Sequence, residues 1–325
     1  LLSVQAIESI RNFGLIGVYV LEPAEPLPPM TQEDLEFERF QIKAVSAIEE
    51  ELDRILKTRK QSRIQTIADM VIRNYGHLDE KINFYQNLRS LEDYVSRHSL
   101  NVAILCAMIT HVMNIRREEQ YHTVCAALLH DMGKLKKHED VYFGAPYSRE
   151  DAIRNCETQE EAYSVIEDAF ATEGPAIRRI CQQAAGKQLD LFPEEGKESR
   201  YKMLEGSNVL LVANRYDEIT AMTLQGTAQS EVKAAQELLE HPEVYDPETV
   251  QALLRSINIL PPGASVELST GEKALVLREN KENVLRPTVV SFRDNSILNL
   301  ALPQNEDIQI VDVMKTMDNR YILKK

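Results

Sequence analysis

The stretch Cys125-Ala-Ala-Leu-Leu-His-Asp-Met-Gly-Lys134 places a histidine and an aspartate side by side, His130 and Asp131, at the end of an apolar helical run. A neutral imidazole nitrogen and a carboxylate oxygen are both good ligands for first-row divalent metals, and this mixed set suits iron, manganese, zinc or nickel without choosing between them. Neighbouring helical residues point about 100° apart. The pair therefore indicates a metal site in which one ion lies above the groove between the two side chains.

Two ligands are too few to hold a metal ion firmly, so further ligands must come from elsewhere in the chain. His98 is the next candidate, within Tyr94-Val-Ser-Arg-His-Ser-Leu-Asn-Val-Ala103. The apolar residues that follow recur at helical spacing: Val102, Leu105, Ile109 and Val112. We therefore expect a second helix that brings His98 against the first pair.

Three segments together resemble successive signatures of the HD-GYP branch of the HD phosphohydrolase superfamily: His98-Ser99, Leu128-Leu-His-Asp-Met-Gly-Lys134 and Val212-Ala-Asn-Arg-Tyr-Asp-Glu-Ile-Thr220. The resemblance implies a bacterial signalling protein with an all-helical domain. Members with the full motif bind two or three metal ions and hydrolyse cyclic di-GMP. Residues 2–20 are similar to the close of a small module often found before such domains, and residues 261–277 look like a strand-rich extension often found after them.

The sequence also departs from this family pattern at its metal-binding positions. Active members carry a glutamate one turn before the first histidine, where this chain has Tyr94. They carry a further histidine where this chain offers residues 157–159, Glu-Thr-Gln. Gln183 and Ala184 stand where the family's paired histidines are expected, and the last metal-binding aspartate is replaced by Asn214.

These losses predict a reduced metal site. A hydrolytic metal needs several ligands and an open position for water, whose pKa it lowers. Only His98, His130 and Asp131 remain as metal ligands, so we expect no cofactor, or at most one divalent ion of iron, manganese, zinc or nickel. The alternative for His130 and Asp131 is a buried, mutually hydrogen-bonded pair. We expect Asn214 to hydrogen bond to the imidazoles rather than to bind metal.

Further side chains are candidates for catalytic or ligand-binding roles. If the domain is active, Asp131 and Lys134 would be catalytic, since the position of Lys134 contacts phosphate in active relatives; the alternative is a solvated lysine. A small phosphorylated ligand would need a local polar patch, for which Asn214, Gln183, Arg97 and Lys187 are the candidates. The alternative for the basic residues is ordinary solvated surface.

Composition places the chain among cytoplasmic proteins. With 325 residues, 43% of them hydrophobic, it can bury a sizeable core and form two or three domains. No run approaches the roughly 18 apolar residues of a membrane helix, and no signal peptide is visible. The net charge of −14 argues against general nucleic-acid binding. Four scattered cysteines are typical of reduced core thiols: Cys106, Cys125, Cys156 and Cys181.

The pattern along the chain predicts a mainly α protein in four parts. Residues 1–30 would be the end of a small α/β module with a Pro-rich linker, 31–91 a helical neck, 92–256 an all-helical HD-type core, and 257–325 a small β-rich module. In the neck we expect helices to about residue 60, over 64–74 and over 78–91. Strands are expected over 265–268, 274–278, 288–292, 307–313 and 320–323. The neck would either mediate a homodimer or pack on the core.

The sequence thus favours a degenerate HD-GYP-like signalling protein that has lost cyclic di-GMP phosphodiesterase activity and binds a partner protein or a nucleotide. The alternative is an active metal-dependent phosphohydrolase with a reduced metal site. A third possibility is a structural dimerisation protein. The chain begins abruptly with Leu1-Leu2, from which we expect an upstream segment.

Overall fold

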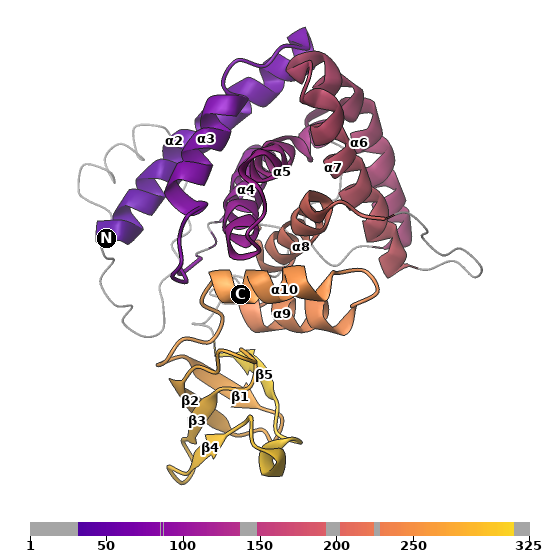
Figure 1. Ribbon diagram of the computed structural model, residues 1–325. Coiled ribbons are helices and arrows are strands. Elements are labelled where there is room, and N and C mark those ends of the chain that lie inside the picture. The colour runs from indigo at the N-terminus through magenta and orange to yellow at the C-terminus, as the bar shows by residue number, and fades with distance from the viewer. Residues whose placement is uncertain are drawn as a thin grey trace, which may run out of the picture.

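The computed structural model describes residues 32–84, 86, 88–136, 148–192, 202–223 and 228–314 (Figure 1). The predicted N-terminal module over 1–30 and the predicted strand over 320–323 lie outside these residues. In the described part the fold is mainly helical with a small antiparallel sheet near its C-terminal end, which confirms the predicted fold class.

Helices α4 and α5 form the centre of the helical part. Figure 1 shows them between the α2–α3 pair and the α6–α7 pair, with α8 below. α4 is buried along nearly all of its length because its sequence is apolar on every face, as expected for a core helix. The helices are α2 (Gln32–Thr58), α3 (Ile64–Tyr75), α4 (Tyr94–Val112), α5 (Arg117–Leu129), α6 (Arg149–Phe170), α7 (Gly174–Gln188), α8 (Glu205–Thr220), α9 (Glu231–Glu240) and α10 (Pro247–Ser256), with 3-10 turns η1 (Met132–Lys136), η2 (Leu189–Leu191) and η3 (Pro303–Asn305).

The neck packs on the helical core. Ile48, Leu52 and Ile55 of α2 are fully buried, and α2 contacts α4, α3 and α6. The turn between α2 and α3 is held by Glu51, whose carboxylate accepts hydrogen bonds from the backbone N–H groups of Ser62 and Arg63. The first two neck helices were thus predicted to within two residues at their C-terminal ends. A homodimer through the neck stays a prediction.

The predicted third neck helix, over residues 78–91, is wrong. This stretch has no described helix before Tyr94 and instead makes isolated parallel bridges, Ile82 with Ile257 and Arg89 with Thr223. The Arg89 N–H donates to the carbonyl of Met222 (2.8 Å). These partners are distant in the sequence, so a local apolar pattern could not reveal them.

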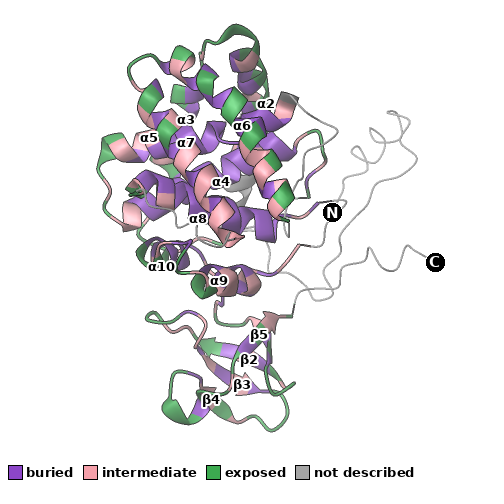
Figure 2. Cartoon of the chain, turned by 90° about the vertical axis from the view of Figure 1, so that its right-hand side faces the viewer, coloured by how far each residue is buried: buried purple, intermediate pink, exposed green. Residues whose placement is uncertain are grey.

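The C-terminal strands form one sheet in the order β4-β3-β2-β1-β5, with all neighbours antiparallel. Alternate residues face a small apolar interior, which Figure 2 shows as buried. The side-chain amide of Gln236 on α9 donates to the carbonyl of Ile310 (2.8 Å) and ties the sheet to the helices. The strands are β1 (Ser265–Leu268), β2 (Lys273–Arg278), β3 (Thr288–Ser291), β4 (Ile297–Asn299) and β5 (Ile310–Val313).

Most strands were predicted within a few residues, and β4 was missed because its three residues carry too little pattern. The four cysteines are free thiols, three of them buried, as predicted. In the described ranges we find no helix with the length and apolar character needed to cross a membrane.

Candidate metal centre

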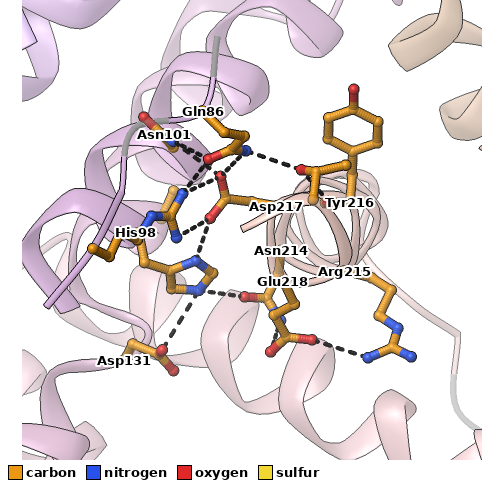
Figure 3. A network of polar contacts seen from close by, with 12 residues as sticks. Gln86, His98, Asn101, Asp131, Asn214, Arg215, Tyr216, Asp217 and Glu218 are labelled. Carbon is orange, nitrogen blue, oxygen red and sulfur yellow. Dashed lines mark hydrogen bonds and ion pairs between the residues drawn. The ribbon is translucent and has the colours of Figure 1, made fainter. Parts of the chain in front are cut away.

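Three helices bring the predicted metal ligands together. His98 lies in the second turn of α4, His130 and Asp131 directly follow α5, and Asn214 lies on α8. All four are buried, with exposed fractions of 0 to 7%. The predicted approach of His98 to the His-Asp pair is therefore present, and Figure 3 shows how Asp131, His98 and Asn214 point toward one another.

The four side chains meet through their metal-binding atoms. Nε2 of His98 lies 3.1 Å from Nε2 of His130 and 2.8 Å from Oδ1 of Asn214, and the Asn214 oxygen lies 2.9 Å from Nε2 of His130. Oδ2 of Asp131 is 3.5 Å from Nε2 of His98. Two ligands at about 2.1 Å from one ion and about 90° apart are about 3 Å from each other. The spacing therefore fits neighbouring ligands of a single ion.

The hydrogen bonds on the far sides of the rings determine which atoms face this point. Nδ1 of His130 donates to the carbonyl of Ala127 (2.8 Å), and Nδ1 of His98 donates to the carboxylate of Asp217 (2.6 Å). A neutral imidazole has one N–H, so both Nε2 atoms present lone pairs. The Asn214 amide donates to Glu218 (3.2 Å), which leaves its Oδ1 facing the rings.

Four acceptors thus converge, and none of them donates to another; the Asp131 oxygen also accepts from the ammonium of Lys134. A proton would satisfy only two acceptors, whereas a divalent cation would satisfy all four. The set of two imidazoles, a carboxylate and an amide oxygen is the mixed N/O set that first-row divalent metals accept. The side chains of His98, His130 and Asp131 therefore fit a metal ion. The Asn214 oxygen lies at hydrogen-bond distance from both imidazoles, and the expectation that Asn214 hydrogen bonds to them instead of binding metal stays a prediction.

The carboxylate of Asp131 is fixed from its other side. The ammonium of Lys134 donates to Oδ2 (2.7 Å) and the amide of Gln159 donates to Oδ1 (3.1 Å). Burial raises the pKa of Asp131, but Lys134 and the two histidines lower it more, so the group is ionised. Burial also lowers the pKa of His130, which favours its neutral, metal-binding form. Lys134 is itself buried and is not a solvated lysine.

Sequence reasoning missed a second polar cluster directly behind His98. Asp217, fully buried on α8, accepts two hydrogen bonds from the guanidinium of Arg89 (2.7 and 2.8 Å) and others from Gln86 (2.8 Å) and Asn101 (3.0 Å). The sequence could have indicated Asp217, because it lies three residues after Asn214 and therefore on the same face of a helix. Arg89 had no such signal because it lies outside any regular element.

The remaining residues that the sequence singled out contact neighbours other than the converging acceptor atoms. Tyr94 stacks on His98, with ring centroids 5.5 Å apart. Arg97 pairs with Asp93, and Lys187 pairs with Asp190. Gln183 accepts hydrogen bonds from the backbone N–H of residue 204 (2.9 Å) and from the hydroxyl of residue 207 (2.9 Å), at the start of α8.

A small cavity of about 30 Å³ lies beside the cluster, bordered by His130, Asp131, Lys134, Gln159 and Asn214, among others. Its size suffices for an ordered water, which needs at least about 10–15 Å³. Gln159 belongs to the stretch 157–159 that the sequence offers in place of a further histidine, and it joins Asp131 to the backbone N–H of Gly133 (3.1 and 2.9 Å).

Residues 95–222 match the family model of the HD domain. The match covers less than half of the chain and includes all four converging side chains together with Asp217. It supports membership of this helical part in the HD phosphohydrolase superfamily, whose domains are generally metal-dependent hydrolases. Comparison with curated proteins and with solved structures gave no match.

Proposed function

We propose that the helical core is an HD-type domain that holds one divalent metal ion through His98, His130, Asp131 and Asn214, and that it serves a bacterial signalling protein as a binding module without cyclic di-GMP phosphodiesterase activity. The observation that carries the proposal is that three acceptor atoms, from His130, Asn214 and Asp131, lie 2.8 to 3.5 Å from the Nε2 atom of His98.

The chain's own residues prepare this site for one ion. The carbonyl of Ala127 and the carboxylate of Asp217 orient the two imidazoles, Glu218 orients the Asn214 amide, and Gln159 and Lys134 hold Asp131. When bound, a divalent ion would act as a Lewis acid and would lower the pKa of a coordinated water. Among the described residues the cavity beside the metal position measures about 30 Å³, which supports a binding role over turnover of a dinucleotide at this position.

In the part of the chain that the structure describes, one group of candidate metal ligands comes together, and this single group supports the loss of phosphodiesterase activity. Where the HD-GYP resemblance expects further histidines, Gln159 is engaged with Asp131 and Gly133, and Gln183 is engaged at the start of α8. Neither amide reaches the converging acceptors among the described contacts. The ligand would be a protein partner or a cyclic dinucleotide. The proposed cytoplasmic setting rests on composition, and the proposed homodimer rests on the charged helical neck.

A second candidate is a mononuclear phosphohydrolase. It is favoured by Lys134, whose buried ammonium borders the cavity next to Asp131 and is correctly charged for a phosphoryl oxygen. In this candidate Lys134 and Asp131 would take the catalytic roles expected from the sequence.

Metal analysis combined with a turnover assay tests both. The purified chain is expected to contain about one equivalent of metal, and Asp131→Ala is expected to lose it. Cyclic di-GMP and a general phosphodiester such as bis-p-nitrophenyl phosphate are then incubated with the protein and added manganese, iron, zinc or nickel. Metal without turnover supports the binding module. Turnover that disappears in Asp131→Ala and Lys134→Met supports the phosphohydrolase, and a wild-type chain that binds none of these metals contradicts the proposed metal site.

A further inference from the structure

The carboxylate of Asp217 is saturated by donors. Its Oδ2 accepts from Nη1 of Arg89 and from Nδ1 of His98, and its Oδ1 accepts from Nη2 of Arg89, from Gln86 and from Asn101 (Figure 3). A carboxylate offers about four lone-pair positions. Arg89 pairs with both carboxylate oxygens through two parallel hydrogen bonds, the geometry of an ionised carboxylate with a guanidinium. Asp217 is therefore held as an anion and has no lone pair left for a metal ion.

His98 lies between two acceptors that compete for its single N–H. Asp217 is 2.6 Å from Nδ1, and Oδ1 of Asn214 is 2.8 Å from Nε2. A hydrogen bond to an ionised carboxylate is roughly twice as strong as one to a neutral amide. The N–H therefore stays on Nδ1, and the lone pair of Nε2 faces the metal position. If the proton moved to Nε2, that N–H would donate to Asn214 and close the site with an internal hydrogen bond.

We propose that Asp217, held by Arg89, is a positioning residue that keeps His98 in its metal-binding tautomer. The inference rests on the proposed metal site but concerns a residue that contacts no metal. Arg89 supplies the charge and the two parallel hydrogen bonds that keep Asp217 ionised and aimed at His98. The Asn214 amide is the weaker of the two acceptors that His98 faces, so the carboxylate of Asp217 holds the N–H on Nδ1.

The variant Asp217→Asn tests the proposal with little change in shape. An amide that accepts from Arg89 presents its NH2 group to Nδ1 of His98, so the ring must carry its proton on Nε2. In metal-free protein, 15N NMR of the imidazole rings is expected to show His98 protonated at Nδ1 in the wild type and at Nε2 in the variant, with His130 unchanged. Zinc affinity, measured by competition with a chromophoric chelator, is expected to fall about 10- to 100-fold.

Two further variants complete the experiment. Asp217→Asn leaves the buried Arg89 without a counter-charge, so the double variant Arg89→Met with Asp217→Asn removes both charges and is measured alongside it. Glu51→Gln is the matched control, since it also converts a buried, hydrogen-bonded carboxylate to an amide but lies in the neck. This control is expected to keep the wild-type tautomer and zinc affinity.

The outcomes separate this inference from the proposed function. A wild-type His98 with its proton on Nε2 overturns the inference without any variant. The inference is also overturned if either the folded Asp217→Asn variant or the double variant keeps His98 protonated at Nδ1 and has a zinc affinity within about twofold of the wild type. If the wild type binds no zinc but the tautomer changes as expected, the proposed metal site fails while the control of His98 by Asp217 stands.

Discussion

Two buried polar clusters share α4 and α8, and they differ in the balance of donors and acceptors. Around Asp217, each carboxylate oxygen meets N–H donors, and the charge of Arg89 matches that of the aspartate. Around Asn214, two imidazole nitrogens, an amide oxygen and a carboxylate oxygen face one another with no donor between them. The balanced cluster has a donor for each acceptor, whereas the unbalanced one has the arrangement of side chains that could hold a cation.

The largest effect should come from breaking the balanced cluster. Arg89→Met leaves the carboxylate of Asp217 buried without its counter-charge, and we expect the free energy of unfolding to fall by about 3–5 kcal/mol. The control Arg59→Met removes the exposed partner of Asp168 and should cost less than about 1 kcal/mol. Denaturant titration measures both. A loss of similar size in the two variants would show that the Arg89 pair does not behave as a buried ion pair.

The next effect should come from making the unbalanced cluster more negative. In Asn214→Asp, a carboxylate replaces the amide that donates to Glu218 and stands near Asp131. In the presence of a chelator we expect a loss of about 2–3 kcal/mol in the free energy of unfolding. Saturating zinc should reverse this loss because the new anion is a stronger metal ligand. An equal loss with zinc and with chelator would contradict a cation site at this point.

A smaller effect is expected where Gln159 supports Asp131. Gln159→Met leaves the backbone N–H of Gly133 without its acceptor and should lower the free energy of unfolding by about 1–2 kcal/mol. Gln182→Met is the control, since Gln182 only contacts the exposed carboxylate of Glu160, and its effect should stay within about 0.5 kcal/mol. Thermal unfolding measures the loss of stability in both variants. Equal losses would show that Gln159 does not stabilise the site.

The smallest effect concerns a balanced carboxylate far from the metal position. Burial raises the pKa of Glu51, but hydrogen bonds from Ser62 and Arg63 lower it more, so its folded-state pKa lies below the usual value of 4.5. Its stabilisation is therefore present above pH 4.5 and is lost as the pH falls through the lower folded pKa. Glu51→Gln should cost about 1 kcal/mol near neutral pH.

The pH dependence of that difference is the decisive measurement. The gap in unfolding free energy between wild type and Glu51→Gln should narrow as the pH is lowered from about 6 to about 3. The exposed carboxylate Glu50, paired with Arg63 on the surface, provides the control variant Glu50→Gln. A gap that widens on acidification would mean that the Glu51 carboxyl is stabilised in its protonated form.

Local patterns in the sequence determined much of this protein. The apolar spacing after His98 and before His130 fixed two core helices, alternation fixed most of the sheet, and the adjacency of His130 and Asp131 pointed to a metal site. These features depend on residues within one or two turns of each other. Periodicity and neighbouring ligands therefore reveal them without knowledge of the fold.

Only the tertiary structure decided which acceptors lack donors. Asp217 meets Arg89 across 128 positions of sequence, and Asn214 meets His98 across 116. Ile82 and Arg89 likewise bond to backbone partners far away in the sequence, at residues 256–258 and 222. A hydrogen bond depends on the direction and distance of two groups that folding brings together. The roles of Asn214 as a fourth acceptor and of Asp217 as the partner of His98 therefore became visible only once the helices were packed.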